Sequence, residues 1–326
     1  MTRATKQTCL AAMFVVATSL GACGSRSGPS GTFTRTFHVS GPVRLELTSG
    51  SGDSRVEAGP PGEVRIHAQF RVRAWPWQSA NRRLVEIQSN PPLAQDGDLI
   101  RVGSFGSHEP SGLSVNYTIG VPPETEIRGR AGSGDLAVEG IKGPTDLQTG
   151  SGNIFASALA GALQLRAGSG DVKLEHLTGP IEVVTHSGDI EINSASGEVR
   201  VRTGSADVRI DHPGGSVVVS AGSGDIGVIG ATQDLRLQTG SGDIAVEGDP
   251  GATNYWDLRA SSGDINLRVP SAASFRIYAR TRSGDIHTAI PFLTEGTPGR
   301  HDFEGRIADG RARVEIETSS GDISLR

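Results

Sequence analysis

The chain has 326 residues, a formal net charge of −5, 36% hydrophobic residues and 45 glycines. This length is enough for one large domain or two ordinary ones. The negative charge argues against nucleic acid as the main partner, and the abundant glycine, which follows no collagen period, indicates many tight turns.

Residues 1–22 are predicted to be the signal peptide of a lipoprotein. Basic residues precede a short apolar stretch, Cys9–Leu20, which is too short to span a bilayer. The segment Leu20-Gly21-Ala22-Cys23 resembles the bacterial lipobox, in which the cysteine is lipidated. The alternative is an ordinary cleaved signal with an accidental cysteine. Cys23 would be the single cysteine of the mature chain, so no intrachain disulfide can form, and its acylation would anchor the protein to a membrane.

Residues 23–31 are rich in glycine and serine and are predicted to form a flexible tether. Gly24, rather than aspartate, follows the cysteine. By analogy with the sorting rule of enteric bacteria, this permits the outer membrane. We therefore expect an exported protein, lipid-anchored in the bacterial cell envelope at the outer membrane, and the sequence leaves the face of the membrane open.

Residues 32–130 are predicted to be an N-terminal β region or irregular first coils. Alternating apolar residues favour strands over 64–74, 99–102 and 113–119. One loop, which contains Trp75 and Trp77 with Arg82 and Arg83, breaks this pattern. The tryptophan rings could contact a partner, or they could cover the open end of the fold.

Residues 131–326 carry a repeat built around a glycine–serine–acid phrase. Consecutive copies are 18 residues apart from the first to the seventh, then 21 residues apart twice, with a longer gap before the last. Each copy closes on an acid or its amide: Asp135, Asn153, Asp171, Asp189, Asp207, Asp225, Asp243, Asp264, Asp285 and Asp322. A fixed period of this length indicates a repeat architecture.

Each repeat contains two short stretches of alternating apolar residues, such as Val172/Leu174 and Ile181/Val183. Period-two alternation rich in valine and isoleucine predicts strands. The apolar parity changes between the two stretches, which requires a bend, and a glycine corner stands at each change. The sequence therefore predicts an all-β parallel β-solenoid with about 18 residues per coil, two strands per coil and two facing sheets.

Two other solenoids with related periods fit poorly. A left-handed hexapeptide β-helix needs an apolar residue at every sixth position, but the positions that would supply two of the three are mostly polar. A calcium β-roll needs a glycine–aspartate turn every nine residues, whereas only alternate half-coils carry the acid.

The ladder of acids has two interpretations. In the structural one, glycine permits the turn and the serine and aspartate side chains bind nearby backbone N–H groups. In the other, the stacked carboxylates bind Ca²⁺. Because a charged acceptor bonded to a backbone N–H gains roughly 1.5–3 kcal/mol, while neighbouring carboxylates repel by roughly 1 kcal/mol in water, the ladder can stand without a cation. We predict turn-forming residues and neither metal nor cofactor.

The sequence shows no catalytic set. The eight histidines contain no metal-ligand pair at helical spacing, and His176 and His212 share a turn position where solvated side chains are expected. The chain ends on Gly321-Asp322-Ile323-Ser324-Leu325-Arg326, which reads as a last strand. That strand would be either a bare edge or covered by the 291–312 segment.

The recurrent Ser-Gly-Asp-Ile phrases at 187–190, 262–265, 283–286 and 320–323, with Tyr117-Thr118-Ile119-Gly120-Val121-Pro122 ahead of the regular coils, resemble the bacterial DUF4097 family, described as putative adhesins. The likeness covers nearly all of the mature chain, except the insertion that contains Trp75. It implies an exported, right-handed β-solenoid with no known reaction or cofactor.

We therefore expect a non-enzymatic cell-envelope lipoprotein that presents a β-solenoid surface for adhesion or scaffolding. Its partners would be the membrane, through the lipid, and a protein or glycan that the sequence does not identify; the oligomeric state stays open. The alternatives are a carbohydrate-active β-helix enzyme, which would need clustered acids in a groove, and a calcium-stabilised binding protein.

Overall fold

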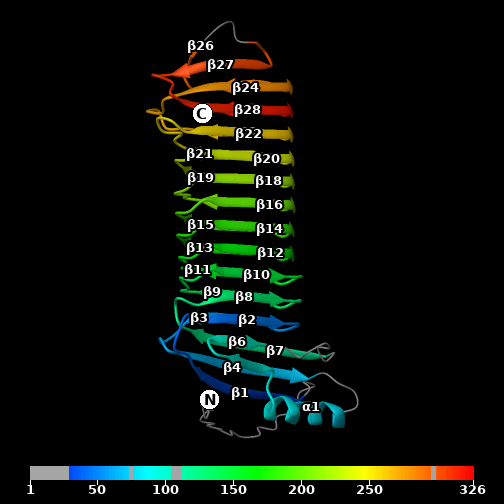
Figure 1. The fold of residues 1–326 in the computed structure, drawn as a ribbon. Helices are drawn as coiled ribbons and strands as arrows, with labels where there is room; N and C mark the ends of the chain where they lie inside the picture. Colours follow the sequence, from blue (N-terminus) through cyan, green and yellow to red (C-terminus); the bar gives the residue numbers. More distant parts are fainter. Residues whose placement is uncertain (1–28, 73–76, 104–111, 295–298) are drawn as a thin grey trace, which may run out of the picture.

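The computed structural model describes residues 29–72, 77–103, 112–294 and 299–326, which form a long stack of coils (Figure 1). Two sheets run the length of the stack: sheet A has 14 strands and sheet B has 15. The strands of the regular coils are parallel, and one helix accompanies them in the described part of the chain. The predicted all-β parallel β-solenoid is confirmed.

The regular coils lie in the middle of the stack, and each contributes one strand to each sheet. Sheet B receives β8 (Glu126–Ala131), β10 (Thr145–Thr149), β12 (Leu163–Ser169), β14 (Ile181–Ser187), β16 (Val199–Ser205), β18 (Val217–Ser223) and β20 (Leu235–Ser241). Sheet A receives β9 (Leu136–Glu139), β11 (Ile154–Ser157), β13 (Val172–Leu177), β15 (Ile190–Ala195), β17 (Val208–Asp211), β19 (Ile226–Ala231) and β21 (Ile244–Gly248).

Equivalent residues of successive regular coils pair across the sheets. Leu147 pairs with Leu165, and Leu165 pairs with Val183, always 18 residues further on. The inward apolar side chains are buried and form one continuous core between the sheets. At the end of each sheet B strand the inward position holds a small residue, such as Thr149 or Ala167, because the core narrows toward the corner.

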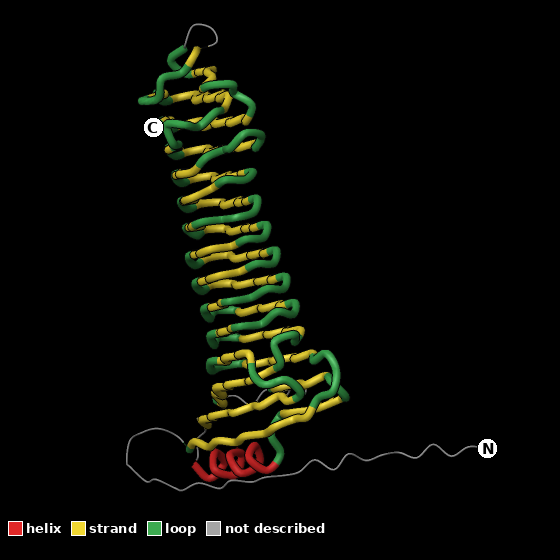
Figure 2. Tube along the Cα trace, turned by 90° about the vertical axis from the view of Figure 1, so that its left-hand side faces the viewer, coloured by secondary structure: helices red, strands yellow, loops and turns green. Residues whose placement is uncertain are grey.

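The coil is right-handed, as the family resemblance implied. In Figure 1 the strands of sheet B face the viewer and run to the right, while successive coils rise from the N-terminal to the C-terminal end. Figure 2 shows the same coils from the side, with their turns aligned in columns. These columns make each turn residue a neighbour of its equivalent in the next coil.

From β9 to β19, a residue at or near the end of each sheet A strand has a left-handed backbone. Ala158, His176, Ser194 and His212 all have φ between 54° and 59°, and glycines hold the same corner in flanking coils. The side chains of His176 and His212 are exposed, as the sequence predicts. Their place in the column therefore reflects a turn rather than a site.

The N-terminal end departs from the regular coil. It contains β1 (Ser30–His38), β2 (Arg44–Ser49), β3 (Ser54–Ala58), β4 (Glu63–Val72), α1 (Trp77–Ser89), β5 (Leu93–Asp96), β6 (Leu99–Val102) and β7 (Leu113–Val121). In sheet A the order is β1-β4-β7-β3-β9, and β4 is antiparallel to both of its neighbours. The strands expected over 99–102 and 113–119 are confirmed as β6 and β7, and the one expected over 64–74 is confirmed as β4 up to Val72, since residues 73 and 74 lie outside the described residues.

Helix α1 is an element that the sequence analysis did not anticipate. Ile87 is buried, and Leu84, three residues earlier, packs against the same core. The helix contacts β1 and β4 at the N-terminal end of the stack (Figure 1). Within the described residues, no helix has the length and apolar character needed to cross a membrane.

The C-terminal end contains β22 (Tyr255–Ser262), β23 (Ile265–Arg268), β24 (Phe275–Ser283), β25 (Ile286–Thr288), β26 (Leu293–Thr294), β27 (Asp302–Ile307), β28 (Ala312–Ser320) and β29 (Ile323–Leu325). The last two strands are not at the edge. In sheet B, β28 lies between β22 and β24, and in sheet A, β29 lies between β23 and β25. The 291–312 segment supplies β26 and β27, and the antiparallel β27 covers β24. Neither expectation for the last strand is correct as stated: β29 is not a bare edge, but the strand beyond it is β25, and the 291–312 segment covers β24 instead.

Candidate recognition groove

The acid of most repeats bonds to the next coil rather than to its own turn. Oδ1 of Asp135 accepts a hydrogen bond from the backbone N–H of Asn153 at 2.8 Å, and Oδ1 of Asn153 accepts one from the N–H of Asp171 at 2.8 Å. The same bond recurs at 3.0 Å or less above Asp171, Asp207, Asp225, Asp243, Asp264 and Asp322. The carboxylates therefore link successive coils through the backbone.

The ladder of acids follows the spatial order of the coils. Asp264 accepts from Asp322, and Asp322 accepts from Asp285, because β29 is inserted between β23 and β25. Within the described residues the ladder has one gap, between Asp189 and Asp207. There Ala206 occupies the position that holds glycine in the neighbouring coils.

Calcium binding by this ladder can be tested directly. Across the described residues no three or more His, Cys, Asp or Glu side chains come together in a group that could hold a metal ion. If Ca²⁺ stabilised the coils, EDTA would lower the melting temperature and Ca²⁺ would restore it. We predict an unchanged melting temperature.

The side chains of three predicted site residues lie outside the described part of the structure. Cys23 and Trp75 lie outside the described residues, and Trp77 is the first residue of α1 with a side chain outside the described set. Lipidation of Cys23 and partner contact by the two tryptophans therefore stay predictions.

A groove with a volume of about 550 Å³ opens near the C-terminal end of sheet B. We call it the C-terminal groove. Strands β22, β28, β24 and β27 contribute its lining: Asp257, Arg259, Tyr278, Ala279, Arg280, Asp302, Phe303, Glu304, Glu315, Ile316 and Glu317. Two columns of outward side chains, separated by two residues along each strand, form its walls.

One side of the groove is organised around a buried carboxylate. Asp257 is 6% exposed and lies 2.7 Å from Nε of Arg259 and 3.8 Å from Nε of Arg236. The hydrogen bond from Arg259 to Asp257 raises the pKa of the guanidinium. A buried carboxylate needs such partners because its desolvation is costly, so these two arginines are positioned by Asp257.

A second cluster consists of one carboxylate, one arginine and two tyrosines. The hydroxyl of Tyr255 donates to Glu315, which is also paired with Arg313, and the guanidinium of Arg313 lies 5.3 Å from the centre of the Tyr278 ring. Burial, followed by the bond to Glu315, raises the pKa of Tyr255 to about 12. The same bond, with Arg313, lowers the pKa of Glu315, so this carboxylate stays ionised at neutral pH.

Three further carboxylates of the groove have no partner of this kind. Within the part of the chain that the structure describes, no hydrogen bond or ion pair reaches the side chains of Asp302, Glu304 or Glu317. The lining thus contains five carboxylates and two arginines. The groove combines aromatic rings and fixed charges with carboxylate oxygens that can accept hydrogen bonds from a ligand.

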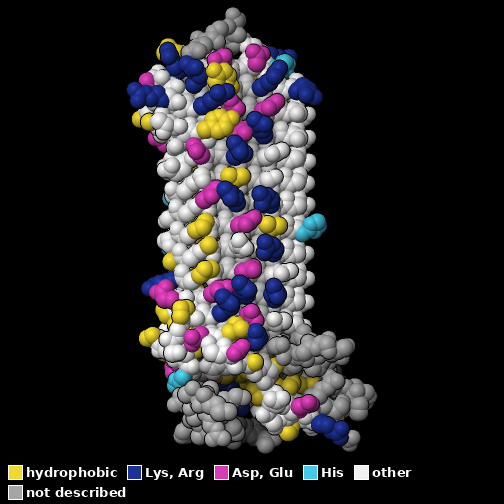
Figure 3. Space-filling model, in the orientation of Figure 1, with side chains coloured by type: hydrophobic (Ala, Val, Ile, Leu, Met, Phe, Trp, Pro, Cys, Tyr) yellow, Lys and Arg dark blue, Asp and Glu magenta, His cyan; other side chains and the backbone are white. Residues whose placement is uncertain are grey.

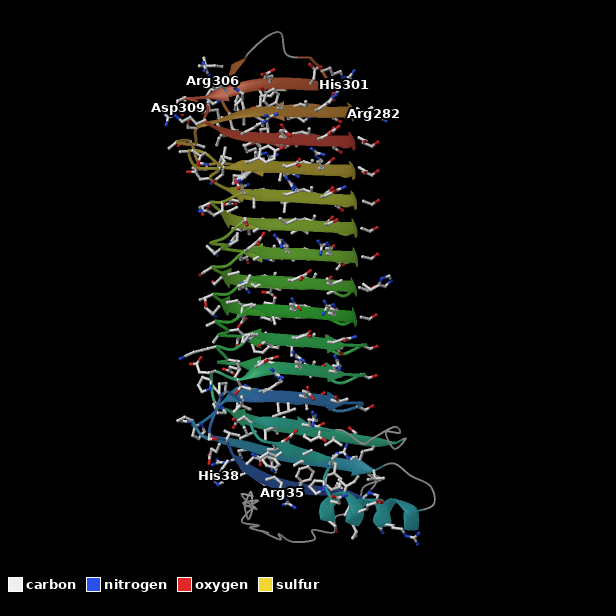
Figure 4. The ribbon with its side chains drawn as sticks, in the orientation of Figure 1. Arg35, His38, Arg282, His301, Arg306 and Asp309 are labelled. Atoms are coloured by element: carbon white, nitrogen blue, oxygen red, sulfur yellow. The ribbon has the colours of Figure 1, made fainter. Side chains whose placement is uncertain are left out.

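Polar residues flank the groove at both corners of the last coils. Figure 4 shows Arg282 and His301 at the corner where the sheet B strands end, and Arg306 and Asp309 at the opposite corner. At the former corner Arg300 lies 2.9 Å from Asp285, the last member of the ladder of acids, and lowers the pKa of that carboxyl group. The cap beyond β24 is therefore tied to the ladder by an ion pair.

The sequence analysis missed this groove because its residues do not follow the repeat. Glu315 lies between Asp257 and Tyr278 only because β28 inserts between β22 and β24. No fixed period predicts that arrangement. One signal was available: all of these residues lie after position 250, where the 18-residue spacing lapses.

A family model matches the chain over the regular coils and the C-terminal end of the stack. The family model described as Toastrack DUF4097 matches residues 124–326. No curated protein matches the chain.

The solved structures that the chain is similar to are distant in sequence. They include a putative adhesin from Bacteroides fragilis NCTC 9343, 10% identical, with a TM-score of 0.37 and coverage of 91% of this chain and 97% of that one. They also include a putative lipid binding protein from Parabacteroides distasonis ATCC 8503, 12% identical, with a TM-score of 0.38 and coverage of 90% and 96%. At these identities and TM-scores the likeness is too general to assign a function.

Proposed function

Because the chain belongs to the Toastrack DUF4097 family, we propose that it is a non-enzymatic lipoprotein of the bacterial cell envelope that presents its β-solenoid surface for adhesion or scaffolding. The observation that carries this proposal is the C-terminal groove, a polar and partly aromatic recess on a rigid stack. Tyr278 can pack against a sugar ring or an apolar side chain, and the unpaired carboxylates can accept its hydrogen bonds.

The arrangement suits a protein held at its N-terminus. The edges of the 15-stranded sheet B lie roughly 65 Å apart at about 4.8 Å per strand. Six residues separate Cys23 from Ser30 at the start of β1, and the seven steps between the two residues can span at most about 25 Å. An acyl chain on Cys23 would thus hold the N-terminal end near the membrane and leave the groove at the far end of the stack.

The anchor has a direct test. Cells that express the full chain are labelled with radioactive palmitate, and the same is done for Cys23→Ser. We expect label in the wild type and none in the variant. Equal labelling of both, or no labelling of the wild type, would remove the lipid from the proposal.

Recognition by the groove is tested with immobilised protein and envelope fractions, followed by cross-linking and identification of captured proteins and glycans. The variant Tyr278→Ala with Glu317→Gln alters the groove. The matched control, Glu247→Gln with Asn266→Ala, alters sheet A near the same level of the stack. We expect a specific ligand to be captured by the wild type and the control and lost by the groove variant. Absence of any ligand, or equal capture by both variants, would contradict the proposal.

A carbohydrate-active enzyme is the second candidate, favoured by the clustered carboxylates of the groove. Glycoside hydrolysis needs one carboxylic acid that is protonated near neutral pH and a second that is ionised. The lowered pKa of Glu315 makes it unsuitable as that acid. Glu317 lies in the same groove and is the carboxylate to test. Turnover of chromogenic glycosides that is lost in Glu317→Gln would favour the enzyme over the binding protein.

A further inference from the structure

In the regular coils, the two central outward columns of sheet B differ in charge from those of sheet A, and Glu126 and Glu198, just outside the columns of sheet B, pair with Arg128 and Arg200. Between β8 and β20, the two central columns of outward residues on sheet B hold six arginines and two carboxylates, a net charge of +4. These are Arg128, Arg130, Arg166, Arg200, Arg202 and Arg236, with Asp146 and Glu182. The corresponding columns of sheet A, from β9 to β21, hold two cations and five carboxylates, a net charge of −3: Lys173, Arg209, Glu139, Glu175, Glu191, Asp211 and Glu247. The overall charge of the chain conceals this division.

The arginines of sheet B include a regular column. Arg130, Arg166 and Arg202 occupy equivalent positions on β8, β12 and β16, with the uncharged Gln148 and Val184 on the strands between them. Because neighbouring strands are about 4.8 Å apart, these guanidinium groups start roughly 9.6 Å from one another. Figure 3 views the face of sheet B and shows basic side chains recurring along it. We call these three residues the arginine column.

The arginine column is available to a ligand. The side chains of Arg166 and Arg202 are 52% and 64% exposed, and their partners Asp146 and Glu182 lie 3.7 and 3.2 Å away. Exposed pairs of this kind contribute only about 0.2–1 kcal/mol. Arg130 is exposed, and no ion pair with a described residue involves it. A ligand carboxylate can therefore replace these partners and accept two hydrogen bonds from a guanidinium.

We propose that the arginine column binds a linear acidic polysaccharide in which carboxylated sugars alternate with uncharged ones. The chain of sugars would lie along the solenoid axis on sheet B, with one carboxylate at each arginine. This inference rests on the proposed function as an envelope adhesin and names a ligand class for a second surface, distinct from the C-terminal groove.

The spacing and the neighbours of the column favour this ligand over other polyanions. A nucleic acid strand carries a charge about every 3.4 Å along a duplex, far closer than the arginines. A polymer with one charge per two sugars presents charges at wider intervals. The amides of Gln148 and Gln164 and the hydroxyl of Ser220 lie between or beside the arginines on the same face, where they can bond sugar hydroxyls.

The test uses the chain from residue 24 onward, which contains every described residue and the whole of the continuous core. Hyaluronate is the alternating probe, dextran is the neutral polymer, and single-stranded DNA is the closely charged polyanion. Binding is measured by calorimetry at low and at physiological salt. We expect hyaluronate to bind more tightly than DNA, dextran not to bind, and the affinity to fall as salt rises, since the contact is electrostatic.

The variant Arg130→Gln, Arg166→Gln, Arg202→Gln should lose at least about tenfold in affinity for hyaluronate, since it removes three charged contacts. The matched control Lys173→Gln, Arg209→Gln removes the cations of sheet A and should change affinity by less than about twofold. Both should melt at the wild-type temperature, because all five side chains are exposed.

Equal affinity of the triple variant and the wild type would overturn the inference. So would binding of DNA as tight as that of hyaluronate, which would show a general polyanion site. Absence of hyaluronate binding would overturn it as well. If the groove variant still loses its captured ligand in that case, the proposed function stands and only the assignment of sheet B fails.

Discussion

The regular coils and the two ends of this solenoid differ in how their strands are connected and paired. In the middle, every strand is parallel and every coil meets a copy of itself. At each end the chain instead runs outward and returns: β7 inserts between β3 and β4, and β28 inserts between β22 and β24. Antiparallel strands, β4 and β27, then lie beyond the returning strand. A stack of identical coils would leave the backbone groups of its first and last strands unpaired. The ends therefore depend on sequence that does not repeat.

The same division separates the kinds of interaction. In the described part of the chain, each aromatic ring pair lies at an end: Phe33 with Phe70, and Phe292 with both Phe275 and Phe303. The middle relies on aliphatic ladders and on the aspartate bonds between coils. The candidate groove also lies at an end. Both the caps and the candidate groove therefore lie where the sequence departs from the repeat.

The largest effect is expected where the middle joins the C-terminal end. Trp256 is fully buried, pairs with Leu235 below and Val314 above, and donates its indole N–H to the carbonyl of Gln233 at 2.7 Å. Trp256→Ala should cost about 3–5 kcal/mol, measured by denaturant unfolding. Limited proteolysis should then cleave after residue 250 while the regular coils stay protected, because solenoid coils depend on their nearest neighbours.

Trp256→Phe is the milder control, since it keeps most of the packing and removes the hydrogen bond. It should cost less than the alanine variant. If Trp256→Ala costs no more than about 1 kcal/mol, well below the range for a buried ring, the end does not depend on this residue.

The next largest loss of stability is expected at the glycine corners of the regular coils, which stack closely on one another. A Cβ at Gly188 would lie 2.2 Å from the carbonyl oxygen of Gly170, and the φ of Gly188 is 101°. Gly188→Ala should therefore cost roughly 1–3 kcal/mol, seen as a lower melting temperature.

The neighbouring coil allows the opposite substitution, from alanine to glycine. Ala206 occupies the equivalent position, where the bond between the acids is missing. An alanine-to-glycine change within a helix or strand normally costs about 0.5–1 kcal/mol. Ala206 lies in the turn between β16 and β17, and Ala206→Gly should cost less because it allows the Asp189–Asp207 bond to form. A full cost at Ala206, or no cost at Gly188, would show that the corners do not limit the stack.

A smaller effect is expected at the left-handed corner. Ala158 has a φ of 54°, a conformation that costs a non-glycine residue roughly 1–2 kcal/mol, while glycine loses about 0.5–1 kcal/mol of entropy. Ala158→Gly should thus stabilise the protein by about 0.5 kcal/mol. Ala162→Gly, at the other corner of the same turn region, should destabilise it. Destabilisation by both changes would argue against strain at the left-handed corner.

The smallest effect is the pH dependence of the C-terminal cap. Arg300 lowers the pKa of Asp285 below its ordinary value of 3.8. A lowered carboxyl pKa contributes stability above the ordinary value, which is lost as pH falls through the lowered one. Arg300→Ala should therefore melt slightly below the wild type at pH 7. The difference should shrink in acid as the carboxyl group becomes protonated in both proteins, and an equal difference at both pH values would contradict this account.

The sequence determined the regular part of the fold almost completely. The 18-residue period, the apolar parity of residues such as Val172 and Ile181, and the glycine corners specify two strands per coil because each coil contacts only its neighbours. The charge of each sheet face could also have been summed from those positions. The bonding of each aspartate to the next coil, rather than to its own turn, needed the stacked geometry.

Only the tertiary structure decided the ends. Helix α1 packs Leu84 and Ile87 against the hydrophobic core at the N-terminal end of the stack. Glu315 bonds to Tyr255 because a strand from the end of the chain inserts between two earlier ones. These contacts join residues far apart in sequence and follow no period. Their free energy depends on which surfaces the completed stack leaves exposed, and a local pattern carries no information about those surfaces.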